Sequence, residues 1–140
     1  MKKILIDTSI WVDYFKGSEV VTGAINDLDT GTIYITGPVM TELIMGVKNK
    51  KESKDLVLAL ESLLCLEITG QEWIDAGMLG SALRQKGITI PLPDLIIFTV
   101  ARNNNCAIWS RDKHFKIIRE TTGSDLAIIE PGLGGTDNRY

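Results

Sequence analysis

The chain has 140 residues, of which 44% are hydrophobic and 24% are charged, and its formal net charge is −3 at pH 7. This size and composition are typical of one globular domain that buries its own core, and they exclude a low-complexity chain. Because the chain is slightly acidic overall, any contact with nucleic acid must depend on local basic patches.

No segment predicts export or a membrane role. Two lysines near the start are followed by only three apolar residues before Asp7, far fewer than a signal peptide needs. The longest apolar run, residues 95–101, is too short to cross a bilayer. We therefore expect a cytoplasmic protein. Cys65 and Cys106 lie in apolar runs without metal-ligand spacing, which predicts reduced core thiols.

The first half of the chain alternates short apolar runs with helical patterns. The apolar runs predict strands at residues 2–6, 32–35 and 65–68. Apolar residues at helical spacing predict helices at residues 10–15, 20–28, 37–47 and 56–64. Gly17 suits a left-handed C-terminal cap, Ser18 an N-cap and Pro38 a first helical turn. The basic stretch 48–51 is expected to be a solvated connection.

The second half continues the alternation. Thr69 and Glu72 fit a capping box, which predicts a helix that ends near Gly87. Two prolines then make a stiff approach to a helix that starts at Asp94 and reaches residues 103–105. A carboxylate is favoured at such a helix start for structural reasons alone. The remaining apolar runs predict strands at residues 106–109 and 126–129.

This alternation predicts an α/β fold with a central parallel β-sheet flanked by helices. In such folds ligands bind in the crevice beyond the carboxyl ends of the strands. We expect one domain over residues 1–131 and a flexible C-terminal tail over residues 132–140.

Four acids stand at predicted junctions of strands, loops and helices: Asp7, Glu42, Asp94 and Asp112. Converging carboxylates bind hard cations such as Mg²⁺ or Mn²⁺, which offset their mutual repulsion. A cation held in this way can polarise a phosphoryl oxygen and lower the pKa of a bound water. Each acid taken alone is also compatible with a solvated or helix-capping role, which is the common one for acids. Sequence spacing does not show whether the four meet.

The sequence resembles the PIN-domain ribonucleases, especially the VapC toxins of toxin–antitoxin pairs. The resemblance extends from residue 3 to about residue 130, and it rests on four segments in order, residues 6–13, 41–47, 93–97 and 110–115. It implies a PIN-like three-layer fold in which the first and fourth strands are neighbours. That arrangement would bring Asp7 and Asp112 to the same crevice.

The resemblance also implies an activity and a site. The four acids match the family's acidic quartet, which holds one or two Mg²⁺ or Mn²⁺ ions and hydrolyses RNA phosphodiester bonds. Ser9 and Ser110 match hydroxyls that support this site by hydrogen bonding. The expected protein is an endoribonuclease, the toxin of a VapBC pair. It would form a homodimer and bind a VapB-type antitoxin whose C-terminal segment covers the acidic groove. Exposed apolar residues on the first helices, around Trp11, Tyr14 and Phe15, are candidate contact surfaces.

Other functional candidates are less specific. A basic group beside Asp112, formed by Arg111, Lys113 and Lys116, could bind RNA phosphates. The alternative is a solvated helix face neutralised by nearby acids, including Glu120. We expect His114 to be non-catalytic, because a carboxylate–metal site already supplies an activated water.

Three further interpretations of the sequence are weaker. The three tryptophans lie in apolar patterns and are expected in the core rather than on a base-stacking surface. A phosphatase with an Asp-x-Asp motif fits poorly, because position 9 is serine. The main non-enzymatic alternative is a PIN-like interaction module that acts as a partner-bound subunit with little turnover. The presence of all four acids argues against that alternative.

Overall fold

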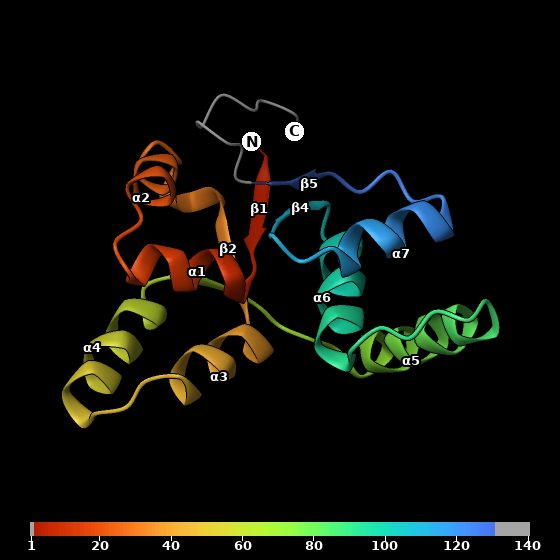
Figure 1. The fold of residues 1–140 in the computed structure, drawn as a ribbon, viewed down its shortest axis with the longest axis horizontal. Coiled ribbons are helices and arrows are strands. Elements are labelled where there is room, and N and C mark those ends of the chain that lie inside the picture. Colours follow the sequence, from red (N-terminus) through yellow and green to blue (C-terminus); the bar gives the residue numbers. More distant parts are fainter. Residues whose placement is uncertain (1, 131–140) are drawn as a thin grey trace.

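The computed structural model describes residues 2–130, which form a five-stranded parallel sheet with helices on both faces (Figure 1). The strands are β1 (Lys3–Ile6), β2 (Ile33–Thr36), β3 (Leu64–Leu66), β4 (Cys106–Trp109) and β5 (Ile128–Ile129). Their order across the sheet is β3-β2-β1-β4-β5, and every neighbouring pair is parallel. The expected α/β class and the pairing of the first with the fourth strand are therefore confirmed. The expected tail at residues 132–140 lies outside the described residues.

The helices form two layers, one on each side of the sheet (Figure 1). One layer contains α1 (Thr8–Phe15), α2 (Glu19–Asn26), α3 (Gly37–Met45) and α4 (Lys50–Glu61). The other contains α5 (Gly70–Gln85), α6 (Leu92–Asn103) and α7 (His114–Thr122). Right-handed crossovers explain this division. The chain moves across the sheet in one direction from β1 to β3 and in the opposite direction from β3 to β5, so the helices of the two halves fall on opposite faces. The result is the predicted three-layer arrangement, with a parallel sheet between two layers of helices.

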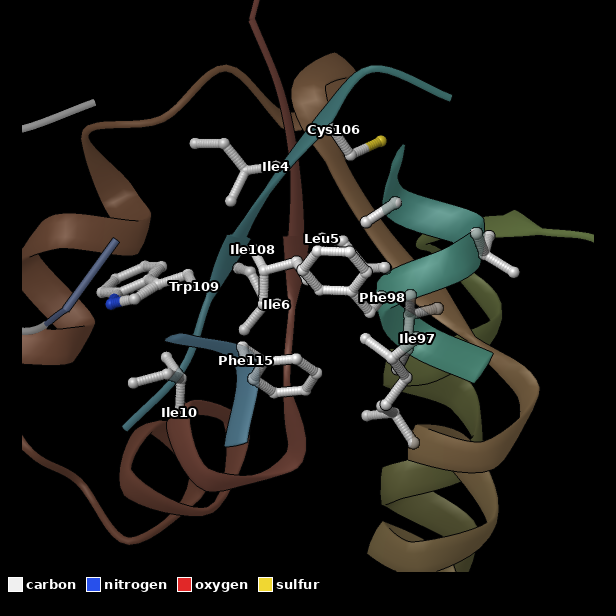
Figure 2. Packing of buried hydrophobic residues seen from close by; sticks show 14 of the residues in the cluster. Ile4, Leu5, Ile6, Ile10, Ile97, Phe98, Cys106, Ile108, Trp109 and Phe115 are labelled. Carbon is white, nitrogen blue, oxygen red and sulfur yellow. The ribbon is translucent and has the colours of Figure 1, made fainter. Parts of the chain in front are cut away.

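The core lies between the sheet and these layers. Leu5, Ile97 and Phe98 are at most 1% exposed, and Figure 2 shows them together between β1 and α6. On the other face of the sheet, Ile6 and Trp109 lie toward Ile10 of α1 (Figure 2). Because successive strand residues point to opposite faces, the buried central strands supply apolar side chains to both layers.

Several local predictions are confirmed. Gly17 adopts a left-handed backbone with φ of 84° after α1. Ser18 caps α2, where its Oγ accepts a hydrogen bond from the N–H of Val21 at 3.3 Å. Thr69 and Glu72 form both hydrogen bonds of a capping box at the start of α5. These features depend on a few neighbouring residues, so short sequence patterns predict them well.

The structure differs from the sequence predictions in two helices. Residues 50 and 51, expected in a solvated connection, begin α4 because the side chain of Asn49 caps it by accepting from the N–H of Glu52. Helix α7 is not among the elements predicted in chain order, where a helix here is only the alternative to a basic group that binds phosphates. Its signals are the spacing of the buried Phe115 and Ile118, followed by Gly123 in a left-handed cap.

Three expectations about burial are wrong. Cys65 is exposed, because β3 lies at the edge of the sheet, whereas Cys106 is buried as predicted. Trp73 is 47% exposed on α5, although the other two tryptophans are in the core. Trp11 itself is only 3% exposed, so Phe15, at 45%, is the more accessible part of the expected contact surface.

Among the described residues, none of the helices combines the length and apolar character that crossing a bilayer requires.

Candidate metal centre and active site

The four acids predicted from the sequence line a single cavity of about 370 Å³. Asp7 follows β1, Glu42 lies on α3, Asp94 is in the first turn of α6, and Asp112 lies between β4 and α7. The cavity therefore lies at the carboxyl ends of β1 and β4, with α3 from one helical layer and α6 from the other contributing to its walls. This is the edge of a parallel sheet where ligands usually bind. Its remaining lining residues are Thr8, Ser9 and Arg111.

Asp7 is held on the sheet side of the cavity. It is 6% exposed, and its backbone N–H donates to the carbonyl oxygen of Trp109 at 3.0 Å. Its Oδ2 accepts a hydrogen bond of 2.7 Å from Oγ of Ser110. Burial raises the pKa of Asp7, and the charge of Asp112 adds to this effect, whereas the hydrogen bond from Ser110 opposes it.

The two serines connect the loops that carry these acids. The Oγ atoms of Ser9 and Ser110 lie 3.5 Å apart, and Ser9 Oγ accepts from the N–H of Arg111 at 3.2 Å. Ser110 Oγ also accepts from the N–H of Asp112 at 2.9 Å. These hydrogen bonds hold the loop after β4 against the start of α1.

Asp94, Asp112 and His114 form the second group in the site. His114 Nδ1 lies 2.8 Å from Oδ2 of Asp94 and 2.9 Å from Oδ1 of Asp112. The polar atoms of these three residues that could bind a metal all lie within 4.8 Å of one another. Burial, followed by the charge of Asp112, raises the pKa of Asp94 to about 7, although the bond to His114 acts in the opposite direction.

Glu42 lines the cavity from α3, in the helical layer opposite to the one that carries Asp94. Unlike Asp7 and Asp94, it is exposed on α3. Its carboxylate therefore has freedom to adjust to a bound ion or substrate. The structure thus brings all four predicted acids to one cavity, with two of them fixed by burial and hydrogen bonds.

Two of the three basic residues beside the site pair with acids other than Asp112 and Glu120. Arg111 forms an ion pair of 3.0 Å with Asp13, and Lys116 forms one of 2.7 Å with Glu130. Lys113 is exposed immediately before α7. Of these three basic residues, Arg111 is the one that lines the acidic cavity.

Sequence reasoning missed three contributors to this region. His114 was expected to be non-catalytic, but its ring contacts two of the four acids. The signal for it was its position two residues after Asp112. Thr8 lines the cavity, and Asp13 positions Arg111. Thr8 and Asp13 carried no separate signal, because their roles depend on contacts with distant loops.

The donor set fits a divalent cation. Four carboxylates share the cavity, and burial together with their mutual repulsion raises the pKa values of Asp7 and Asp94. The buried Oγ1 of Thr8 has no hydrogen-bond partner within residues 2–130, although Thr8 lines the same cavity. A hard cation with bound water would offset the repulsion and offer this hydroxyl a partner. Asp7, Glu42, Asp94 and Asp112 are the residues that could hold it.

Comparison with known proteins identifies a family. The sequence profile of the PIN domain matches residues 4–120. "Ribonuclease VapC1" of Methanocaldococcus jannaschii is 29% identical over 119 residues, which are 84% of this chain and 82% of that protein.

Solved structures share the fold. VapBC2 from Rickettsia felis, bound to a DNA fragment from its promoter, has a TM-score of 0.74 and 23% identity over 91% of this chain and 97% of that chain. DNA-bound VapBC from Salmonella typhimurium has a TM-score of 0.72 and 21% identity, over 94% of this chain and 100% of that chain. VapC20 from Mycobacterium tuberculosis, a toxin that cleaves the sarcin–ricin loop, has a TM-score of 0.68 and 14% identity, over 82% and 94% of the two chains.

Proposed function

The chain belongs to the PIN domain family, and from this premise we propose that it is a Mg²⁺- or Mn²⁺-dependent endoribonuclease that acts as the toxin of a VapBC pair. The observation that carries the proposal is the convergence of four carboxylates from four separate parts of the chain on one cavity. The relative named as a ribonuclease supports the choice of RNA as substrate.

The acidic residues would act by holding the cation and orienting the reacting groups. When bound, the cation would polarise the scissile phosphate and favour ionisation of the attacking water. Asp7 and Asp94 would be its most firmly held ligands, because both are buried and hydrogen-bonded. Glu42 would close the site from α3, and Asp112 would orient water or a second ion.

Neighbouring side chains would support these acids and the substrate. Ser110 fixes Asp7 and the backbone of Asp112, and Ser9 fixes the backbone of Arg111. Arg111 and Lys113 would contact RNA phosphates at the rim, with a smaller contribution from Lys116, which is already paired with Glu130. Because this basic group is local, it would attract RNA despite the net negative charge of the chain.

The proposed partners follow from the similar proteins. Several solved structures of this fold are toxin–antitoxin complexes, including one from Klebsiella pneumoniae. We extend this to a VapB-type antitoxin that covers the acidic cavity, and to a cytoplasmic homodimer in which Phe15 of α1 contributes exposed apolar surface. The convergence of all four acids favours this enzyme over a catalytically weak interaction module.

Cleavage of a panel of structured and single-stranded RNAs tests the proposal. Purified protein would be incubated with Mg²⁺, Mn²⁺ or EDTA, beside Asp7→Asn and Asp94→Asn variants. Asp55→Asn is a matched control, since it removes one exposed carboxylate from α4, away from the cavity. We expect metal-dependent cleavage by the wild type and the control, and loss of cleavage in the two site variants.

Two results would contradict the proposal. Equal cleavage by the wild type and both site variants would identify a contaminating nuclease. Folded wild-type protein that binds its antitoxin but cuts no RNA with either metal would favour the interaction module.

A further inference from the structure

We infer that His114 is a metal ligand, which donates its ring Nδ1 to the same cation as Asp94 and Asp112. The inference rests on the proposed function, because it assumes a divalent cation in the acidic cavity. It extends that function by adding a nitrogen ligand to a site that the sequence predicts as purely carboxylate.

The spacing of the three donor atoms carries the inference. Nδ1 lies 2.8 Å from Asp94 Oδ2 and 2.9 Å from Asp112 Oδ1. Adjacent ligands of an octahedral ion, with bonds of about 2.1 Å at right angles, lie roughly 3 Å apart. The nitrogen is therefore already as far from each of the two carboxylate oxygens as neighbouring ligands are on one ion, and the candidate ligand atoms of the three residues all lie within 4.8 Å of one another.

An ordinary hydrogen bond explains only half of this arrangement. Nδ1 carries at most one hydrogen, so it fully satisfies one carboxylate oxygen. Here oxygens of two different carboxylates lie within hydrogen-bond distance of the same nitrogen. A shared cation accounts for the convergence of all three atoms, and Nε2 then carries the ring hydrogen.

The backbone holds the imidazole at this position. The N–H of His114 donates to Oδ1 of Asp112 at 2.9 Å, which fixes the first turn of α7 on that acid. The next residue, Phe115, is fully buried and anchors α7 in the core. The backbone that carries the ring is therefore held beside Asp112 and anchored to the core.

A nitrogen ligand has a consequence for metal choice. Imidazole favours Mn²⁺, Co²⁺ and Zn²⁺ relative to Mg²⁺, which prefers oxygen ligands and retained water. Replacing His114 by glutamine, which offers an amide oxygen, should weaken Mn²⁺ binding by about tenfold or more, by analogy with the loss of supporting groups at metal sites. Mg²⁺ binding should change much less.

The chain contains a single histidine, so a ring-nitrogen signal has only one source once any affinity tag is removed. We would measure nitrogen hyperfine coupling by pulsed electron paramagnetic resonance on the Mn²⁺-loaded wild type, His114→Gln and Glu120→Gln. Glu120 is exposed on the same helix and provides the matched control. We expect the coupling in the wild type and the control, and its loss in His114→Gln with Mn²⁺ still bound.

The outcomes separate this inference from the function on which it rests. Mn²⁺ bound in the wild type without nitrogen coupling, together with unchanged affinity in His114→Gln, would overturn the histidine ligand and leave the carboxylate site intact. A wild type that binds no Mn²⁺, or binding unaffected by Asp94→Asn, would overturn the metal site itself and the inference with it.

Discussion

Ser110 donates a hydrogen bond of 2.7 Å from its Oγ to Oδ2 of Asp7, which joins the loop after β4 to the end of β1. Ser110 Oγ also accepts a hydrogen bond from the N–H of Asp112 at 2.9 Å, so the Ser110 side chain orients two of the four acids. Both contacts are possible because β1 and β4 are adjacent and in register, with Ile6 opposite Trp109.

Replacing Ser110 by alanine should damage both the site and the fold. Asp7 loses a buried donor, which costs about 1–3 kcal/mol of unfolding free energy, and metal affinity should fall roughly 10–100-fold. Urea unfolding and Mn²⁺ titration measure the two effects. Ser124→Ala, which removes a hydroxyl that accepts from the N–H of Leu126, is the control for a local loss of hydrogen bonding. Unchanged metal affinity in Ser110→Ala would show that Asp7 needs no such support.

The raised pKa of Asp94 predicts how the stability of the metal-free protein depends on pH. Its folded-state pKa is about 7 and its ordinary value is 3.8, so the folded protein binds more protons between these values. The free energy of unfolding should therefore fall as pH rises from about 4 through about 7. The raised pKa of Asp7 acts in the same direction.

Thermal or urea unfolding in EDTA across this pH range measures the effect. Asp94→Asn should flatten the profile and stabilise the metal-free protein at pH 8, because it removes a buried charge. Added Mn²⁺ should stabilise the wild type more at pH 8 than at pH 5, since protons compete for its ligands. A wild-type profile that rises with pH would contradict the prediction.

Lys113 should contribute more to RNA binding than Lys116. Lys113 is exposed beside the site, whereas Lys116 already pairs with Glu130 at 2.7 Å. Removal of one phosphate contact by Lys113→Gln should reduce the slope of log affinity against log salt by about 0.7 for single-stranded RNA. Fluorescence anisotropy with a catalytically inactive Asp94→Asn background measures this slope at several salt concentrations.

Lys50→Gln, on α4, controls for the change in net charge. An equal loss of binding in Lys113→Gln and Lys50→Gln would indicate a general charge effect rather than a phosphate contact.

Phe98 should be a main determinant of stability. It is fully buried between β1 and α6, beside Leu5 and Ile97 (Figure 2). Phe98→Ala should lower the free energy of unfolding by about 3–5 kcal/mol, because it leaves a cavity in the core. Phe98→Leu should cost much less, since it keeps most of the apolar volume. Urea unfolding distinguishes the two variants, and similar costs would show that the core collapses around the smaller residue.

The sequence by itself determined the local features of this protein. Apolar runs located the strands, and the capping residues Ser18 and Thr69 marked helix starts, because each depends on bonds between residues a few positions apart. The α/β class follows from that alternation. The chemical types of the four acids were also sufficient to suggest a divalent cation.

Only the tertiary structure decided which of these residues meet. Asp7, Glu42, Asp94 and Asp112 share a cavity because the strand order places β1 beside β4 and the crossovers put α3 and α6 in opposite layers. The contact of His114 with Asp94 arises in the same way. Such contacts join residues far apart in the chain, so they depend on the packing of the whole sheet rather than on any local pattern.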